Sequence, residues 1–314
     1  CIIIVFYALG GIILCMLKVL VTGGAGFIGS NLVEKLLELG HDVISIDNES
    51  SQSNEVFYWA EKSSNYKLDI CDYDRIRPLF EEVDIVYHLA AEARIQPSLN
   101  NPILTAKTNA LGTCTILQCA REAGVKRVIY SSTSSAYGRK NSTPSVESMQ
   151  KDCLTPYSVT KTCGEELCKM FTDLFGLETV VFRYFNVYGE RQPIKGQYAP
   201  VVGIFLKQKK EGLPMTIVGD GLQRRDFTHV SDVVEANLLA SNLKNKNISG
   251  ELFNIGTGRN YSIIDIKDMI GSEFINLPKR MGEAQETLAD ITKAKKMLDW
   301  SPKVVLEDWI TNNK

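Results

Sequence analysis

The stretch KVLVTGGAGFIG, residues 18–29, decides the fold of this chain. It opens with an apolar run that predicts a buried strand, and glycines then follow at the spacing G-x-x-G-x-x-G. Residues 31–39 continue with apolar side chains at helical spacing and stop at Gly40, which predicts a helix. Together these elements form a diphosphate site, because glycines admit backbone N–H groups to the anion and the helix dipole favours negative charge. We therefore expect a nucleotide cofactor in contact with Gly23, Gly26, Phe27, Ile28 and Gly29.

A second signal for a nucleotide is an acidic residue at the end of the next apolar run. Asp47 follows residues 43–46, roughly 20 residues past the glycines, where a carboxylate accepts hydrogen bonds from the adenosine ribose and repels a 2′-phosphate. No arginine follows, since the next residues are Asn48, Glu49 and Ser50. The pattern favours NAD over NADP and places Asp47 and Asn48 in the cofactor site. The alternative is that Asp47 only opens a turn.

Composition and charge exclude several other classes of protein. The 314 residues are 44% hydrophobic and carry a net charge of −2, which allows a large core and one or two domains. No basic tract is present, so the charge pattern does not argue for nucleic acid or an anionic membrane as a partner. Eight cysteines without a C-x-x-C pair, together with three histidines, disfavour a zinc site. We expect no metal, and reduced cysteines in a cytoplasmic protein.

The strongly apolar segment before the first strand needs its own interpretation. Residues 1–15 are short of the ~20 residues that a membrane span needs, and they lack the basic start and cleavage site of a signal peptide. Met16 resembles a natural start, so we interpret residues 1–15 as translated upstream sequence or a dispensable extension. A membrane anchor is the alternative.

Strand-like and helix-like runs alternate up to about residue 183, which predicts a parallel sheet covered on both faces. The expected fold class is α/β, a Rossmann-type doubly wound parallel sheet with a smaller C-terminal substrate-binding lobe. We assign the nucleotide-binding domain to residues 16–183 with return segments at about 215–245, and the lobe to residues 184–214 and 246–314. Strands are expected at 18–22, 43–47, 66–69, 85–89, 127–131, 179–183, 215–218 and 251–254, and helices at 27–39, 73–80, 103–123, 156–175, 231–241, 262–270 and 290–298.

A catalytic pair is predicted at the start of one of these helices. Tyr157 and Lys161 lie one turn apart after Pro156, so both project from the same helix face. A free phenol has a pKa of about 10, and a neighbouring ammonium lowers that pKa, which makes Tyr157 a candidate base. The pattern alone is also typical of a surface pair. Residues 128–138 favour catalysis, because they predict a buried strand ending in hydroxyls, and that end of a doubly wound sheet faces the cofactor crevice.

With these motifs in order, the chain resembles the extended short-chain dehydrogenase/reductases, and most closely the nucleotide-sugar 4-epimerases of the UDP-galactose epimerase type. The resemblance runs from residue 16 to about residue 309. Its motifs are the glycine turn, Asp47, Asp69-Ile70, His88-Leu89-Ala90-Ala91, Asn109, Ser131-Ser132-Thr133, Tyr157 with Lys161, Arg183-Tyr184-Phe185-Asn186, Arg225-Asp226-Phe227 and Arg280-x-Gly282-Glu283.

The resemblance also implies which residues contact NAD and a UDP-sugar. On the cofactor side it implies Asp69 and Ile70 at the adenine, Leu89, Ala90 and Ala91 along the pyrophosphate and ribose, and Tyr184 near the nicotinamide, with Asn109 and Ser131 also in the cofactor site. On the substrate side it implies Asn186, Arg225 and Arg280 at the diphosphate, with Val202 also in contact. Forked arginine donors match phosphate oxygens, which fits that role.

The implied reaction inverts a sugar hydroxyl at C4. Tyr157, as a phenolate beside Lys161, takes the proton of the 4-hydroxyl with help from Thr133, while a hydride moves to NAD and later returns to the other face of a 4-keto sugar. Dehydratases of the family carry a carboxylate just after the hydroxyl residue, whereas this chain has Thr133-Ser134-Ser135, which favours epimerisation. A dehydratase, a reductase and a non-enzymatic protein that keeps the nucleotide site are the alternatives.

Two residues bear on the identity of the sugar. Counting from Arg280, the resemblance places the residue beside the sugar at Thr287, and a small side chain there admits an N-acetyl group. The expected substrates are therefore UDP-N-acetylglucosamine and UDP-glucose. UDP-glucuronate is the alternative, because Arg94 lies in a loop near the sugar and can meet a carboxylate.

A homodimer is the expected assembly. The predicted helices 103–123 and 156–175 carry apolar residues beyond one face, and the resemblance implies that this pair meets its twin in a four-helix contact. The apolar residues include Ile103, Ile116, Leu117, Leu167, Met170 and Phe171.

Overall fold

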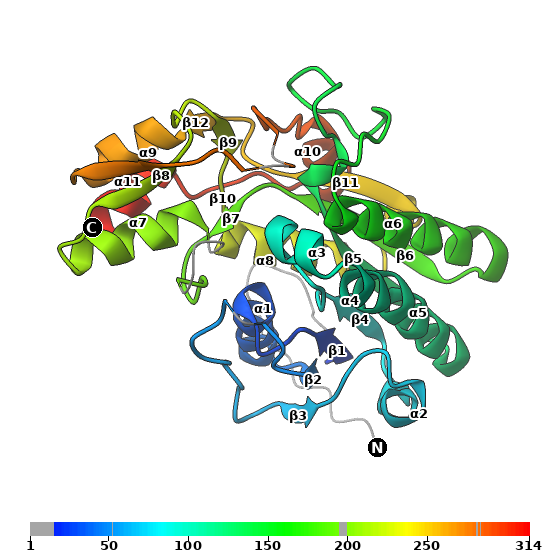
Figure 1. The fold of residues 1–314 in the computed structure, drawn as a ribbon. Helices are drawn as coiled ribbons and strands as arrows, with labels where there is room; N and C mark the ends of the chain where they lie inside the picture. The colour runs from blue at the N-terminus through cyan, green and yellow to red at the C-terminus, as the bar shows by residue number, and fades with distance from the viewer. Residues whose placement is uncertain (1–15, 52, 195–199, 281, 283) are drawn as a thin grey trace.

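A parallel sheet of seven strands is the centre of the part of the chain that the computed structural model describes, residues 16–51, 53–194, 200–280, 282 and 284–314. The strand order is β11-β6-β5-β4-β1-β2-β3, so the chain builds outward from β1 and then returns beside it as β4 (Figure 1). Ligands of such sheets bind at the carboxyl ends of the strands where this reversal occurs. The interpretation of residues 1–15 lies outside the described residues. The strands are β1 (Lys18–Thr22), β2 (Asp42–Asp47), β3 (Ser64–Lys67), β4 (Ile85–His88), β5 (Arg127–Thr133), β6 (Glu178–Tyr184) and β11 (Glu251–Ile255).

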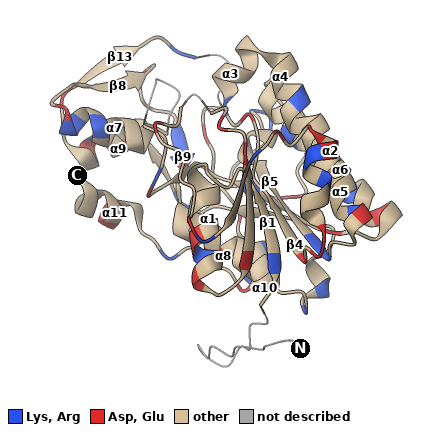
Figure 2. Ribbon diagram, turned by 90° about the horizontal axis from the view of Figure 1, so that it is seen from below, with Lys and Arg blue, Asp and Glu red and all other residues tan. Residues whose placement is uncertain are grey.

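Helices cover both faces of the sheet, which confirms the predicted fold class (Figure 2). Because side chains alternate along a strand, Val19 and Val21 pack into one core together with Trp300, whereas Leu20 packs into the opposite core with Leu117. Helices α1, α8 and α10 contribute to the first core, and α2, α5 and α6 to the second. These helices are α1 (Phe27–Glu38), α2 (Tyr73–Ile76), α5 (Gly112–Ala123), α6 (Pro156–Phe175), α8 (Val230–Ala240) and α10 (Thr292–Leu298).

A smaller lobe with its own core stands over the carboxyl ends of the strands (Figure 1). Val202, Phe205, Ile217, Ile266 and Ile310 are all buried there. Among the described residues, no helix is both long and apolar enough to cross a membrane. The lobe and its connections contain α7 (Val201–Lys210), β8 (Met215–Val218), β9 (Arg224–Asp226), β12 (Asn260–Ser262), α9 (Ile263–Ile270), β13 (Phe274–Leu277) and α11 (Leu306–Asn313). The short strands β7 (Val187–Tyr188) and β10 (Thr228–His229) lie along the chain where it passes between sheet and lobe. Helices α3 (Ile95–Asn100) and α4 (Pro102–Ala106) lie along the chain between β4 and β5.

The expected domain boundaries differ from the observed strand pairing at two places. Residues 215–218 were expected in a return segment of the nucleotide-binding domain, but β8 pairs with β13 in the lobe. Conversely, residues 251–255 fall in the range expected for the lobe, yet β11 pairs with β6 at the edge of the main sheet. The reason is packing, since Ile217 is buried in the lobe core and Phe253 is buried in the main core.

Local structure also departs from one expected helix. The range expected as a single helix, 103–123, is α4, a π-helical turn at Lys107–Leu111, and α5. The π turn places Asn109 inside the molecule, where it is 1% exposed. Such turns occur frequently at functional sites.

A buried arginine holds the amino-terminal end of β5 to the end of α8. Arg127 is fully buried, and its guanidinium donates to Glu178 Oε2 at 2.7 Å and to the backbone oxygens of Ala240, Asn242 and Asn245 at 2.6, 3.0 and 2.9 Å. These bonds satisfy carbonyls that the end of a helix leaves without partners.

We expect Arg127→Met to lower the free energy of unfolding by about 3–5 kcal/mol, because it leaves Glu178 and the three carbonyls without their buried partner. The matched control is Lys126→Met, whose ion pair with Asp84 is on the surface and contributes about 0–1 kcal/mol. Urea unfolding of both variants measures the difference. Equal losses in the two variants would show that Arg127 is no more than a surface charge.

Candidate active site

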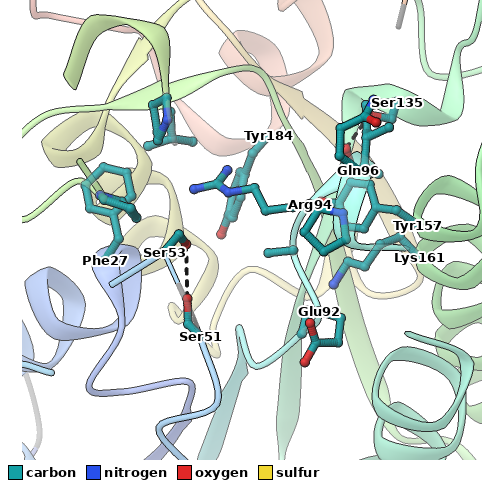
Figure 3. Close-up of a pocket in the computed structure, with 18 of the residues that line it drawn as sticks. Phe27, Ser51, Ser53, Glu92, Arg94, Gln96, Ser135, Tyr157, Lys161 and Tyr184 are labelled. Carbon is teal, nitrogen blue, oxygen red and sulfur yellow. Dashed lines mark hydrogen bonds between the residues drawn. The ribbon is translucent and has the colours of Figure 1, made fainter. Parts of the chain in front are cut away.

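A cavity of about 1160 Å³ lies at the carboxyl ends of the strands, between the sheet and the smaller lobe (Figure 3). Its size exceeds the roughly 300–1,000 Å³ that is typical of sites for one small molecule. Residues of the glycine turn, of the strand ends and of the lobe all contribute to its wall. The cavity therefore has room for a cofactor and a substrate together.

The glycine turn brings backbone to backbone more closely than side chains allow. Gly23 has a φ of +69°, and a Cβ built on it would lie 2.8 Å from the amide nitrogen of Ala90. A Cβ on Gly29 would lie 2.0 Å from the carbonyl oxygen of Gly23. Helix α1 starts after Gly26 without a side-chain cap and without an acidic residue in its first turn. The open N–H groups and the missing side chains fit the diphosphate of a dinucleotide.

The acidic residue after β2 lies where the sequence predicts an adenosine ribose. Asp47 accepts a hydrogen bond from the Glu49 amide at 2.8 Å and from the Ala25 amide at 3.2 Å, so its carboxylate is fixed against the glycine turn. Burial raises the pKa of Asp47, and these backbone amides act in the opposite direction. Both Asp47 and Asn48 face the cavity, which is the geometry that recognition of ribose hydroxyls requires.

Nearly all of the predicted site residues line this one cavity, although their roles are not thereby tested. From the cofactor side they are Gly23, Gly26, Phe27, Ile28, Gly29, Asp47, Asn48, Asp69, Ile70, Leu89, Ala90, Ala91, Ser131, Tyr157, Lys161 and Tyr184, and from the substrate side Arg94, Thr133, Asn186, Val202, Arg225, Arg280 and Thr287.

Asn109 is the exception, since it does not line the cavity. Its side-chain oxygen accepts from the Glu92 amide at 2.8 Å, and its Nδ2 donates to the Glu92 carbonyl at 3.1 Å and to Thr160 Oγ1 at 3.1 Å. Asn109 thus joins the segment after β4 to helix α6. In this geometry it orients the cavity wall instead of contacting a ligand in the cavity.

Tyr157, Thr133 and Lys161 all line this cavity. The side chains of Tyr157 and Thr133 are hydrogen-bonded, and Lys161 Nζ lies 4.4 Å from the centre of the Tyr130 ring. Burial raises the pKa of Tyr157, while the Thr133 hydrogen bond and the charge of Arg94 act to lower it. Burial also lowers the pKa of Lys161 to about 7.

Burial opposes the charged form of both groups of the predicted catalytic pair. Both groups are desolvated by the same cavity wall, and desolvation disfavours the charged form of each. Burial therefore works against the ammonium form of Lys161. The positive charge of Arg94 supplies a second interaction that favours the phenolate.

A buried histidine next to the site has a structural role that its hydrogen bonds define. Thr113 donates its hydroxyl proton to the Asn109 carbonyl at 2.6 Å, so at 2.9 Å it accepts from His88 Nε2. His88 Nδ1 then accepts from the Thr22 hydroxyl at 2.7 Å, and Thr22 accepts from the Ala90 amide at 3.2 Å. Burial lowers the pKa of His88 to about 3, so it stays neutral and holds the strand ends in register.

The side chain of Asn186, just after β6, bonds to two segments of the cavity wall. Asn186 Nδ2 donates to the Asp226 carbonyl at 3.0 Å and to Thr287 Oγ1 at 3.2 Å. The Asp226 carboxylate is buried and accepts from the amides of Thr257, Gly258 and Ala289 at 2.7–3.0 Å. These bonds fix β9, which carries Arg225, and the segment that carries Thr287.

Several residues of the cavity wall were not predicted from the sequence. Glu92 and Gln96 belong to the segment from β4 into α3, and Ser135 follows Thr133 by two residues (Figure 3). Ser134, between them, also lines the cavity. In the sequence, Glu92 and Gln96 come shortly after the 88–91 motif, and Ser134 and Ser135 directly follow Thr133. This closeness to predicted site residues is the signal that could have identified them. From the loop after β2 and from the lobe come Ser50, Ser51, Ser53, Asn54, Phe57, Thr216 and Val218.

Comparison with known proteins assigns this fold and site to a class, the extended short-chain dehydrogenase/reductases. The chain belongs to the NAD-dependent epimerase/dehydratase family, whose family model matches residues 19–256. The predicted cofactor, NAD, agrees with this family.

Three relatives show how the family's substrates vary. A UDP-glucose 4-epimerase of Mycolicibacterium smegmatis is 36% identical over 94% of this chain and 96% of its own. A solved UDP-N-acetylglucosamine 4-epimerase of Methanobrevibacter ruminantium, in complex with UDP-N-acetylmuramic acid, is 30% identical with a TM-score of 0.88, covering 95% of this chain and 97% of its own. A UDP-glucuronic acid 4-epimerase of Bacillus cereus, solved with UDP-glucuronic acid and NAD, is 34% identical with a TM-score of 0.84, covering 94% and 97%.

Proposed function

We propose that this protein is an NAD-dependent UDP-sugar 4-epimerase that inverts C4 of UDP-N-acetylglucosamine, UDP-glucose or both through a transient 4-keto sugar. The observation that carries the proposal is the meeting of Tyr157, Thr133 and Lys161 in the cavity that also contains the glycine turn. The 4-epimerases among its relatives support the same reaction class. Six free cysteines among the described residues are consistent with a cytoplasmic location.

The residues of the chain perform three tasks in this reaction. The Tyr157 phenolate accepts the proton of the 4-hydroxyl, and Thr133, hydrogen-bonded to it, orients that hydroxyl. Lys161 and Arg94 favour the phenolate by their charge. NAD, when bound, accepts the C4 hydride and gives it back. Asn186, Arg225 and Arg280 hold the diphosphate while the sugar turns over, so that the opposite face of C4 meets the cofactor.

The residues after Thr133 favour epimerisation over elimination of water. Ser134 and Ser135 face the cavity and offer hydroxyls there, whereas elimination needs a carboxylate that can exchange protons with C5 and C6. The carboxylate of Glu92 also faces the cavity, but it comes from the segment after β4. Incubation with UDP-glucose therefore is expected to give the 4-epimer and no 6-deoxy-4-keto product.

Tyr157→Phe is expected to lower kcat by ~10²–10⁴-fold, the usual loss when a general base is removed. Only one hydroxyl is lost, so the variant keeps its fold and its affinity for UDP-sugar. Tyr58→Phe, at a half-exposed tyrosine away from Thr133 and Lys161, is the control. Chromatographic separation of 4-epimers gives kcat, and a Tyr157→Phe protein that keeps most of its rate would contradict the assignment.

A small residue at position 287 supports the N-acetylated substrate. Thr287 is half-buried in the cavity wall, and its hydroxyl is held by Asn186. Thr287→Tyr is expected to reduce turnover of UDP-N-acetylglucosamine roughly ten- to a hundredfold and to leave UDP-glucose turnover largely intact, because overpacking costs ~1–3 kcal/mol. Thr287→Ser is the control of matched polarity. Equal losses on both substrates would mean that Thr287 does not border the 2-position.

UDP-glucuronate is a second candidate substrate, and Arg94 is the observation that favours it. Its guanidinium extends toward Tyr184 in the view of Figure 3, and Arg94 lines the same cavity as Tyr157. Burial lowers the pKa of Arg94, which means that the charged form loses solvation that an anionic ligand group would replace. The relative from Bacillus cereus supports this candidate.

Arg94→Gln separates the two candidates. If a sugar carboxylate meets Arg94, kcat/KM falls more for UDP-glucuronate than for UDP-glucose, by about ten- to a hundredfold in the ratio, since a charged hydrogen bond is worth about 1.5–3 kcal/mol. Arg94→Lys keeps the charge and is expected to retain part of the preference. An unchanged ratio would remove UDP-glucuronate from the proposal.

We also propose a homodimer, formed by an apolar surface over α4, the π turn and α6. Ile103, Leu111 and Val159 are 82%, 54% and 52% exposed on these neighbouring elements. Of the residues first expected there, Ile116, Leu117 and Phe171 are buried in the second core and cannot contact another chain.

Light scattering at micromolar concentration is expected to give twice the mass of the chain. Ile103→Glu combined with Val159→Glu is expected to give the monomer mass, because charges would be buried in the contact. Leu222→Glu, at a residue that is 62% exposed on the lobe, is the control and is expected to stay dimeric. A wild-type protein of monomer mass would overturn the dimer.

A further inference from the structure

A buried carboxylate lies behind the catalytic residues, outside the cavity. Glu165 is on α6 and is 5% exposed. One of its oxygens accepts from Ser132 Oγ at 2.5 Å and from Arg183 Nε at 2.8 Å. The other accepts from the second Arg183 nitrogen at 2.7 Å and from Lys151 at 3.0 Å. Both carboxylate oxygens of Glu165 therefore accept hydrogen bonds, from β5 through Ser132 and from β6 through Arg183.

Two of the three partners of this carboxylate are next to a residue of the proposed active site. Ser132 precedes Thr133 on β5, and Arg183 precedes Tyr184 on β6. Glu165 itself is one helical turn after Lys161. The side chains of Ser132 and Arg183 bond to Glu165 on α6, while Thr133 and Tyr184 reach the cavity, whose wall also includes Ser132.

We propose that Glu165 is a positioning residue for catalysis, which ties β5 and β6 to α6 and so fixes Thr133 and Tyr184 relative to Tyr157 and Lys161. This inference rests on the proposed epimerase function. Among the described residues, Glu165 on α6 is the side chain whose hydrogen bonds reach side chains of both β5 and β6. Reacting groups lose about a hundredfold in rate for displacements near 1 Å, so a small shift between β5 and α6 would be felt in kcat.

Glu165 also contributes charge to the site. Burial tends to raise the pKa of Glu165, but Arg183, Ser132 and Lys151 together outweigh burial and keep it ionised. Its negative charge favours the ammonium form of Lys161. The other titratable or charged groups around Lys161 are His88 on β4, Glu92 and Arg94 on the segment that follows, Tyr130 on β5, and Tyr157 and Cys168 on α6.

Two variants separate position from charge. Ser132→Ala removes only the bond between β5 and Glu165, so we expect kcat to fall about tenfold while KM, bound NAD and the pH profile stay unchanged. Glu165→Gln also removes the charge, so we expect a fall of ten- to a hundredfold. Its pH profile shifts as well, because Lys161 then has a lower pKa and the alkaline limb of kcat moves to lower pH.

The matched control is Glu166→Gln, at the next residue of α6, whose side chain is 70% exposed and pairs only with Lys151 among the described residues. It is expected to match the wild type in every measurement. If Glu165→Gln does not fold, Ser132→Ala decides the positioning role. A Ser132→Ala enzyme with wild-type kcat would overturn that role, as would a folded Glu165→Gln enzyme with unchanged kcat and pH profile.

A measurement that needs no substrate distinguishes this inference from the proposed function. The rate at which Lys161 reacts with acetic anhydride, followed by mass spectrometry as a function of pH, reports its pKa. We expect a lower pKa in Glu165→Gln than in the wild type and Ser132→Ala. If the wild type turns over no UDP-sugar, the epimerase proposal fails. If Lys161 reacts with the same pH dependence in Glu165→Gln as in the wild type, the proposed effect of Glu165 on Lys161 is refuted, whatever the outcome for the epimerase proposal.

Discussion

The close approach of backbone segments at the glycine turn is the constraint on which the rest of the structure depends. A side chain at Gly29 would overlap the carbonyl of Gly23, and one at Gly23 would overlap the Ala90 amide at the end of β4. The turn therefore fits only if β1, β4 and the start of α1 come together at one point. That point is also where the strand order reverses, so a single packing requirement creates both the switch in topology and the place where a dinucleotide can bind.

Polar side chains behind the cavity maintain this arrangement away from the glycines. His88 connects β1 and β4 to α5, Asn109 connects the segment after β4 to α6, and Arg127 connects β5 to the end of α8. Each of them is buried with its hydrogen bonds satisfied by groups from different elements. Buried polar networks of this kind specify one arrangement of the elements, since any alternative would leave polar groups without partners.

The sequence allowed the main sheet to be predicted almost strand by strand, and α6 was predicted at its observed bounds, where the structure has Thr155 as the cap and Gly176 at the end. The lobe was less predictable. Its strands are three or four residues long, and β8 pairs with β13 far along the chain, so local periodicity contains little information about them. The cavity residues could be predicted through motifs, but the pKa of Tyr157 could not, because it depends on how deeply the folded wall buries the phenol.

The placement of β11 has a consequence for how the molecule can come apart. The chain leaves the main sheet after β6, builds part of the lobe, returns as α8 and β11, and then enters the lobe again. No contiguous segment contains the whole lobe. Limited proteolysis or gene truncation therefore cannot release it as a separate piece, and a destabilised lobe transmits its loss directly to the edge of the sheet. The lobe and the sheet are therefore expected to unfold together as one cooperative unit, even though they have separate hydrophobic cores.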